Sequence, residues 1–398
     1  MNADTILTST LALVTPNIHK TRKISIHACI RSLMHGADGT VTSIGRGIKS
    51  EAYEKHNIKR ADRLLSNVHL WHELPQIYTA LSLHLCKFTP NPIIHIDWSD
   101  LDTYKRHFLI RASVVFSGRA LTLYQEVHDI RSKEKPKTHE QFLLRLKRML
   151  GDETKSVIVT DAGFKSPWFR QVIAQGWDYV GRVRKPHHYQ TQTQDWQCIS
   201  TLYGQATRTP SVLQATISRH NPLDTTLVLL KEKPKGRKAL NRSGIPYQSL
   251  RSKTYARRAK DPWLLATSLP VTSKLGKKIC SIYRTRMQIE EGFRDMKSQQ
   301  FGLGFGNNRT VKLPRLAVLV FLLSLAHLVL VLIGLAVCAT GTHRQYQANT
   351  YRKRRVLSFH SLGIRAVRRG RFRITMSQWH DTMIQFRKYI RALEYERI

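Results

Sequence analysis

Residues 93–127 read IIHIDWSDLDTYKRHFLIRASVVFSGRALTLYQEV, and this stretch decides the fold. Residues 93–98 form a short apolar run, while residues 107–116 and 119–127 alternate between apolar and polar side chains. The Ser-Gly pair at 117–118 is a typical turn signal. Short runs of this kind, separated by turn residues, predict three consecutive antiparallel β-strands.

The segment that follows alternates helices with strands. Residues 138–150 have helical periodicity, with Thr138 as the predicted N-cap. A strand at 156–161, a short helix at 167–175 and a strand at 177–185 come next. The order βββαβαβ is that of an RNase H-like core, in which crossover helices make the later strands parallel to the first. The predicted fold class is therefore α/β with a mixed sheet.

The rest of the chain differs in composition from this core. The N-terminal part is helical and basic, with a weak helix-turn-helix outline. After residue 187 the periodicity is poor, although strands are predicted at 211–218 and 226–231. A buried strand at 263–269 precedes one long predicted helix that begins after Pro270 and ends near residue 300.

The charge balance points to a polyanionic partner. The 398 residues include 65 Lys and Arg against 27 Asp and Glu, a formal net charge of +38. Since 41% of the residues are hydrophobic, the chain can bury a core, which excludes a wholly disordered basic protein. Nucleic acid is the first candidate partner and an anionic membrane surface the second. The five scattered cysteines indicate a reducing compartment, and we expect no targeting segment.

Four basic residues gather on one predicted helix near the N-terminus. Lys55, Lys59, Arg60 and Arg63 follow three-to-four residue spacing within KHNIKRADRLLSN. An ordinary solvated face would have the same pattern. Given the net charge, we expect these four residues to contact DNA.

One segment is long and apolar enough for a membrane span. Residues 316–338 carry no formal charge, and at about 1.5 Å per residue a helix of this length reaches roughly 34 Å. The flanks are basic on both sides, so they do not indicate which end of a membrane span would face the cytoplasm. His327 lies in the middle of the segment. The alternative is a helix buried on all sides in a folded core.

Three acidic residues fit a two-metal centre for phosphodiester chemistry. Asp97 ends the first predicted strand and Asp161 ends the fourth, so both carboxylates should emerge at one edge of a parallel strand pair. Carboxylate oxygens suit Mg²⁺, and two such ions clamp the attacking and leaving oxygens. The third acid must come from the long helix, which offers Glu290, Glu291 and Asp295.

Helical spacing selects Glu290 among these three. At about 100° per residue, Tyr283, Arg286, Glu290 and Lys297 share an arc of roughly 60°, whereas the two other acids face away. Two cations and an aromatic ring beside a carboxylate are suitable for binding a phosphate ester.

The motif Tyr-x2-Arg-x3-Glu-x6-Lys formed by these four residues resembles that of bacterial insertion-sequence transposases, the group containing the transposon-ten and transposon-five enzymes. The segments HIDWSD, TDAGF, KHNIKRADRLL and YQANTYRKRRVLS resemble the transposon-ten branch most closely, and the resemblance spans nearly the whole chain.

This resemblance implies a DDE transposase that moves DNA by cut-and-paste. Asp97, Asp161 and Glu290 would bind two Mg²⁺ ions, which Mn²⁺ can replace, while Tyr283, Arg286 and Lys297 would hold DNA phosphates. Trp263 matches the family aromatic that stacks on a flipped base; the alternative is a core tryptophan. The steps implied are nicking, hairpin formation, hairpin opening and strand transfer. The partners would be double-stranded terminal inverted repeats, target DNA and a second copy of the chain.

The resemblance also decides the apolar segment, because a span would separate DNA-handling parts across a bilayer. We therefore expect a buried helix at 316–338, no membrane, and a cytoplasmic, nucleoid-associated protein.

The expected regions are a helical DNA-binding region (1–90), the first part of the core (91–186), a basic β-rich insertion (187–262), the second part of the core with the catalytic and apolar helices (263–344), and a basic C-terminal region for DNA contact or dimerisation (345–398). The competing hypotheses are a structure-selective nuclease without strand transfer and an inactive DNA-end-binding protein.

Overall fold

The computed structural model describes residues 1–87, 89–233, 245–258, 260–351 and 354–391. The chain forms two compact units. Unit 1 comprises Met1–Ser156 and Met287–Ile398, and unit 2 is Val157–Arg286. Parts of the basic segments at 231–260 and 351–358 fall outside the described residues, as does the end of the expected C-terminal region.

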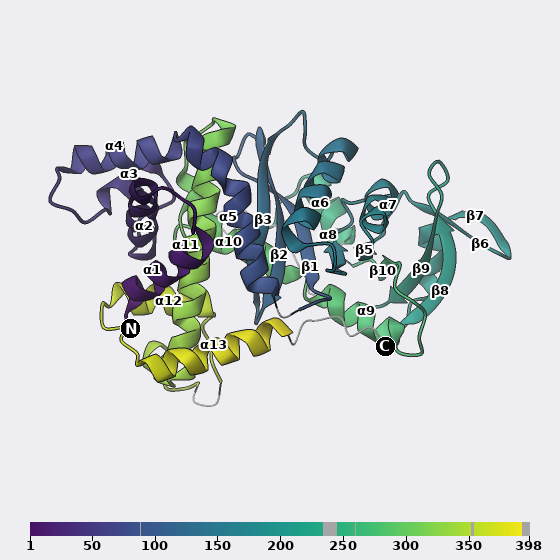
Figure 1. The fold of residues 1–398 in the computed structure, drawn as a ribbon. Coiled ribbons are helices and arrows are strands. Elements are labelled where there is room, and N and C mark those ends of the chain that lie inside the picture. Colours follow the sequence, from purple (N-terminus) through teal and green to yellow (C-terminus); the bar gives the residue numbers. More distant parts are fainter. Residues whose placement is uncertain (88, 234–244, 259, 352–353, 392–398) are drawn as a thin grey trace. The chain divides into compact units, whose positions relative to one another are not determined.

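Unit 1 contains the predicted three-stranded meander, with helices around it (Figure 1). The strands β1 (Ile93–Asp100), β2 (His107–Phe116) and β3 (Arg119–Asp129) pair in antiparallel order, as predicted. The helices are α1 (Ala3–Val14), α2 (Lys20–Met34), α3 (Val41–Arg46), α4 (Glu54–Leu65), α5 (Val68–Cys86), α6 (Pro136–Leu150), α10 (Met287–Lys297), α11 (Leu313–Ala339), α12 (Phe359–Arg368) and α13 (Met376–Arg391), with short 3-10 turns at Phe305–Asn307 and Thr342–Tyr346.

Helices cover both faces of this meander. On one face, Trp98 donates a hydrogen bond from Nε1 to Nε2 of His139 on α6, at 3.1 Å. On the other face, the Arg111 guanidinium lies 4.9 Å from the centre of the Phe293 ring of α10, and α11 packs against β3. Because successive side chains of a strand point to opposite faces, odd and even positions of β1 meet different helices.

The apolar helix α11 forms the core of unit 1. Of its 27 residues 21 are buried, and it packs against α2, α5, α12, α13 and β3. The backbones of α11 and α12 meet closely, since a Cβ on Gly334 would overlap the carbonyl oxygen of Phe359, and one on Gly363 would overlap that of Leu330. In the described residues α11 alone is long and apolar enough to cross a membrane. Its burial within unit 1 agrees with the expected core helix.

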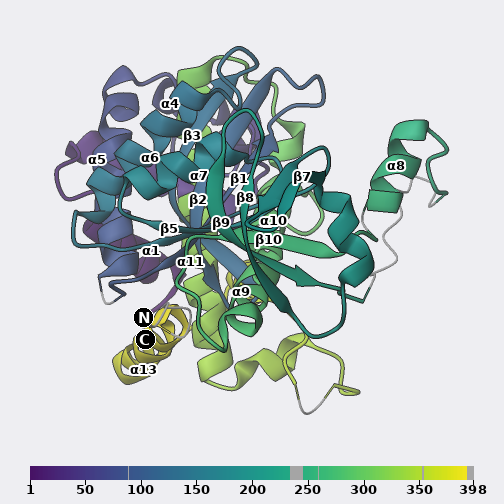
Figure 2. The ribbon, with the colours of Figure 1, turned by 90° about the vertical axis from the view of Figure 1, so that its right-hand side faces the viewer.

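Unit 2 contains later strands of the predicted core and the residues of the expected insertion. Strand β4 is parallel to β5, and the antiparallel order β5-β10-β9-β8-β6-β7 follows. Figure 2 shows β10, β9 and β8 of this sheet. The elements are β4 (Val157–Thr160), α7 (Ser166–Ala174), β5 (Asp178–Arg182), β6 (His188–Thr191), β7 (Gln194–Cys198), a 3-10 helix (Ile199–Gln205), β8 (Ser211–Ile217), β9 (Leu223–Leu230), α8 (Leu250–Arg258), β10 (Trp263–Thr267) and α9 (Leu275–Arg284).

Two helix predictions were wrong in their limits. The single long helix is in fact α9 and α10, which belong to different units and are separated at Thr285 and Arg286. The amides of these two residues bond to the carbonyls three positions back, so the last turn tightens and α9 ends. Helix α6 starts at Pro136 without a side-chain cap, because proline at the first turn already favours helix initiation over the expected Thr138 cap.

Candidate functional site

Asp97 lies on the face of β1 that α10 covers. It pairs with Arg111 across β1 and β2, and directly paired residues point to the same face of a sheet. Arg111 packs on Phe293 and donates a hydrogen bond to Sδ of Met296, both on α10, the latter at 3.2 Å. Asp97 Oδ1 accepts a hydrogen bond from the amide of Trp98 at 2.8 Å. Its carboxylate therefore belongs to the layer between β1 and α10.

Lys297 fixes the position of α10 along β1. Its Nζ donates a hydrogen bond to Oγ of Ser99 at 2.8 Å, and Ser99 shares a strand face with Asp97. At the other end of α10, Gln288 accepts a hydrogen bond from the amide of Gly118 in the β2–β3 turn, at 2.9 Å. That turn lies at the start of β1, so α10 and β1 run in the same direction.

Glu290 lies seven residues before Lys297 and therefore on the same face of α10, while Asp97 lies on the same face of β1 as Ser99. Both acids therefore belong to the layer between β1 and α10. Burial lowers the pKa of the Lys297 ammonium, as does the charge of Arg111, whereas the carboxylate of Asp100 raises it.

Unit 2 gathers the other predicted site residues. Asp161 follows β4 directly and accepts a hydrogen bond from the amide of Gly163 at 2.8 Å. On α9, the buried Tyr283 ring meets the Trp263 ring edge to face, with centroids 5.0 Å apart. The Arg286 guanidinium lies 5.9 Å from the centre of the Tyr283 ring.

Charges from these residues act on the Tyr283 hydroxyl. Burial raises its pKa; the positive charges of Arg286 and Arg182 oppose this, and the negative charge of Asp161 adds to the rise. Asp161, Tyr283, Arg286 and Trp263 thus share one neighbourhood within unit 2. Since Asp97, Glu290 and Lys297 belong to unit 1, each unit carries part of the predicted site.

A comparison of the chain with known protein families identifies its family. A family model described as a transposase DDE domain matches residues 89–329, which include the predicted site residues from Asp97 to Lys297 but not the four on α4. The chain belongs to the DDE transposases. No curated protein matches it. This family acts on DNA and generally uses divalent metal ions, for which hard carboxylate oxygens such as those of Asp97, Asp161 and Glu290 are suitable ligands.

Sequence reasoning missed two arginines of the transposase. Arg182 ends β5, and its Nη2 donates a hydrogen bond to the Asp261 carbonyl at 3.1 Å, just before β10. Arg184 follows it by two residues, and both guanidiniums lower the pKa of Tyr283. Within the described residues, their Nε atoms have no hydrogen-bond partner. In the sequence these two arginines stand within GRVRK, a pattern typical of an ordinary strand end.

The four basic residues predicted near the N-terminus of the transposase all lie on α4, but they are not equivalent. Lys55, Lys59 and Arg63 are exposed. Arg60 is half-buried and donates hydrogen bonds to Oγ of Ser25 at 3.3 Å and to the carbonyl of Ile24 at 3.1 Å. Arg60 therefore attaches α4 to α2, and the other three cations face solvent.

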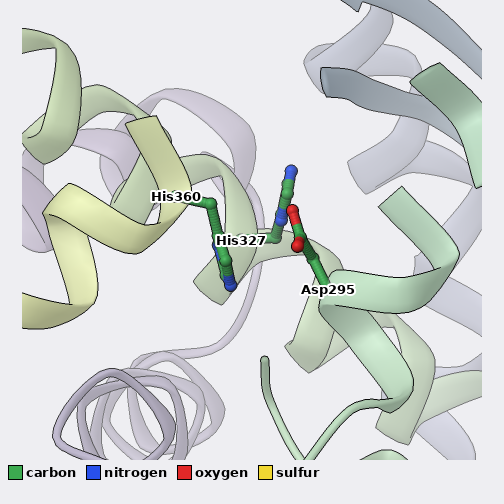
Figure 3. A group of neighbouring side chains, drawn as sticks. All are labelled: Asp295, His327 and His360. Carbon is green, nitrogen blue, oxygen red and sulfur yellow. The ribbon is translucent and has the colours of Figure 1, made fainter. Parts of the chain in front are cut away.

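A second group with metal-ligand chemistry lies in the core of unit 1. Donor atoms of Asp295, His327 and His360 are within 4.8 Å of one another (Figure 3). Asp295 is buried and bonded to Nε of Arg119 at 2.5 Å; burial raises its pKa to about 6 although Arg119 opposes the rise. Burial lowers the pKa of His360 to about 3 and that of His327 well below its usual value.

The geometry of this group favours a neutral imidazole pair over a metal centre. The two rings stack at 4.7 Å with an interplanar angle of 26°, so their nitrogen lone pairs lie in nearly parallel planes and do not converge on one ion. The Arg119 guanidinium acts on both rings and would repel a cation. We interpret the group as stacked neutral histidines beside a buried ion pair.

Proposed function

We propose that this DDE transposase moves an insertion sequence by cut-and-paste, most closely like the transposon-ten branch. Asp97, Asp161 and Glu290 would hold two Mg²⁺ ions, or Mn²⁺ in their place. The observation that supports the proposal is the hydrogen bond from Lys297 to Ser99, which joins the face of α10 that carries Glu290 to the face of β1 that carries Asp97. When bound, the ions supply activation of the attacking hydroxyl and neutralisation of charge on the phosphate.

The remaining residues position the DNA. Lys297, Tyr283 and Arg286 would hold phosphates of the transposon end through charge-assisted or hydroxyl hydrogen bonds. Trp263 is half-buried, and its ring would stack on an unpaired base. The proposed sequence is nicking of one strand, attack of the freed 3′-hydroxyl on the opposite strand to form a hairpin, hairpin opening, and joining to target DNA.

The N-terminal helices would supply further DNA contacts. We propose that Lys55, Lys59 and Arg63 contact the DNA backbone, because their side chains are exposed on one helix. Arg60 instead attaches α4 to α2. Two copies of the chain would pair two terminal inverted repeats before strand transfer. The five sequence regions defined above remain the proposed division of labour, in a cytoplasmic protein associated with the nucleoid.

Removal of single carboxylates tests the assignment. Asp97→Asn, Asp161→Asn and Glu290→Gln should each abolish cleavage of a labelled terminal-repeat fragment while end binding is retained. Glu140→Gln is the matched control, because Glu140 is an exposed acid on α6, outside the predicted site. Full cleavage by any of the first three variants, or cleavage without divalent metal, would refute the assignment. Joining of the labelled 3′ end to a second DNA separates a transposase from a nuclease.

A further inference from the structure

An arginine-lined pocket lies on α12, apart from the residues assigned to catalysis. It has a volume of about 300 Å³, and its wall includes Phe301. The arginines that line it are Arg365, Arg368 and Arg369, and all three are exposed. We call this group the α12 arginine pocket.

The pocket concentrates positive charge without compensation. No acidic residue is among the described residues that line it, and none of its three arginines forms an ion pair with a described acid. Like charges held this close repel one another, and a bound anion would relieve the repulsion. The unpaired charges therefore favour an anionic ligand.

The backbone leaves room for one of these guanidiniums. Gly36 follows α2 with φ +113°, and a Cβ there would lie 3.0 Å from Nε and Nη2 of Arg368. A glycine in this conformation leaves the space that the Arg368 head group occupies. Arg369 is also supported, since its guanidinium lies 5.1 Å from the centre of the Tyr346 ring. Two of the three cations thus have a defined neighbour in the protein, Gly36 for Arg368 and the Tyr346 ring for Arg369.

The residue types are suited to a phosphodiester. Arginine forks match phosphate oxygens, and Arg365 and Arg368 lie three residues apart on one face of α12. The exposed Phe301 ring adds an apolar wall beside these cations. Phe301 also follows Lys297 by four residues, so the pocket begins within about 14 Å of chain from the cation assigned to the cleavage site. Phosphates of one strand recur about every 3.4 Å along duplex DNA, so the DNA can extend from one site to the other.

We propose that the α12 arginine pocket binds the backbone of DNA outside the cleavage site, an inference that rests on the proposed function. The phosphates come either from the transposon end or from target DNA. Both sources have the same chemistry, and two arms of one experiment distinguish them.

The test is the salt dependence of DNA binding, measured with the full chain in a Glu290→Gln background so that no DNA is cut. Arg365→Gln with Arg369→Gln removes two cations from the pocket. Lys137→Gln with Arg148→Gln removes two exposed cations from α6 and is the matched control. One arm uses a terminal-repeat duplex; the other uses capture of an unrelated duplex by the preformed end complex.

We expect the pocket variant to reduce the slope of log affinity against log salt by about 2 in at least one arm, because each lost phosphate contact removes about 0.9 from the slope. A change in the first arm assigns the pocket to the transposon end, and a change in the second assigns it to target DNA. If the slope in both arms equals that of the α6 control, the proposal is wrong. The slope requires no catalysis, so failure of the cleavage assay leaves this test intact.

Discussion

The stacked histidines in the core should make the stability of the transposase sensitive to acid. His360 is fully buried, and burial lowers the pKa of its imidazole to about 3. In the unfolded chain the pKa of histidine is near 6.5. The folded state therefore binds fewer protons than the unfolded state at any pH between these values. The contribution of the neutral His360 imidazole to the free energy of unfolding is complete above about pH 6.5 and is lost progressively as the pH falls towards 3.

The size of the loss follows from the pKa difference. Each pH unit below 6.5 costs about 1.4 kcal/mol for one such histidine, so at pH 5 His360 alone costs about 2 kcal/mol. The pKa of His327 is lowered for the same reason, so its loss adds in the same direction. Since domains are stable by only about 5–15 kcal/mol, this is a large fraction of the total.

Urea unfolding at about pH 7.5 and about pH 5 measures this loss. In each protein we compare the fall in the free energy of unfolding from the higher to the lower pH. This fall should be smaller in His360→Leu than in the unaltered chain, by about 2 kcal/mol. The comparison is made within each variant, so a general destabilisation by leucine cancels. His380→Leu, at an exposed position on α13, should leave the fall unchanged. An equal fall in His360→Leu and the unaltered chain would refute the reasoning.

Three further changes test the packing and the site. Gly334→Ala should lower the free energy of unfolding by about 3 kcal/mol or more, measured by thermal denaturation, because the new Cβ overlaps a backbone oxygen of α12. Gly204→Ala is the control and should stay near the unaltered value, since its Cβ meets nothing within 4 Å. Lys297→Ala should slow end cleavage by about 10- to 100-fold, as expected for a lost charged hydrogen bond, and Ser99→Ala much less; equal rates in all three proteins would contradict a phosphate role. Trp263→Ala should slow hairpin formation and opening more than the first nick, measured by gel resolution of the products; equal slowing would indicate a purely structural tryptophan.

The strands of the core could be predicted because their signal is local. β2 has the predicted limits, and β1 and β3 extend the predicted strands by two residues. Alternation of side chains and a Ser-Gly turn suffice for such elements, since neighbours in sequence are neighbours in the sheet. The buried helix α11 was also recognisable, although only the family resemblance separated it from a membrane span.

The break between α9 and α10 could not be predicted in the same way. No glycine or proline marks Thr285 or Arg286, and the helical spacing continues across them. The common arc predicted for the four motif residues therefore holds for Glu290 and Lys297 on α10, while Tyr283 belongs to α9. The break depends on the different packing of the two helices, which is long-range information.

The rotation of α10 about its axis decides which carboxylate lies toward β1. Neighbouring residues such as Glu290 and Glu291 point about 100° apart. Arg119 on β3 bonds to Asp295 at 2.5 Å and lies 3.8 Å from Glu291, while Lys297 bonds to β1. Both sets of contacts form together in only one rotation of the helix. A buried ion pair adds little net stability because desolvation offsets its attraction, but breaking it is costly. We infer that Arg119, 176 residues before Asp295, orients the helix so that Glu290, which shares a helix face with Lys297, lies toward β1.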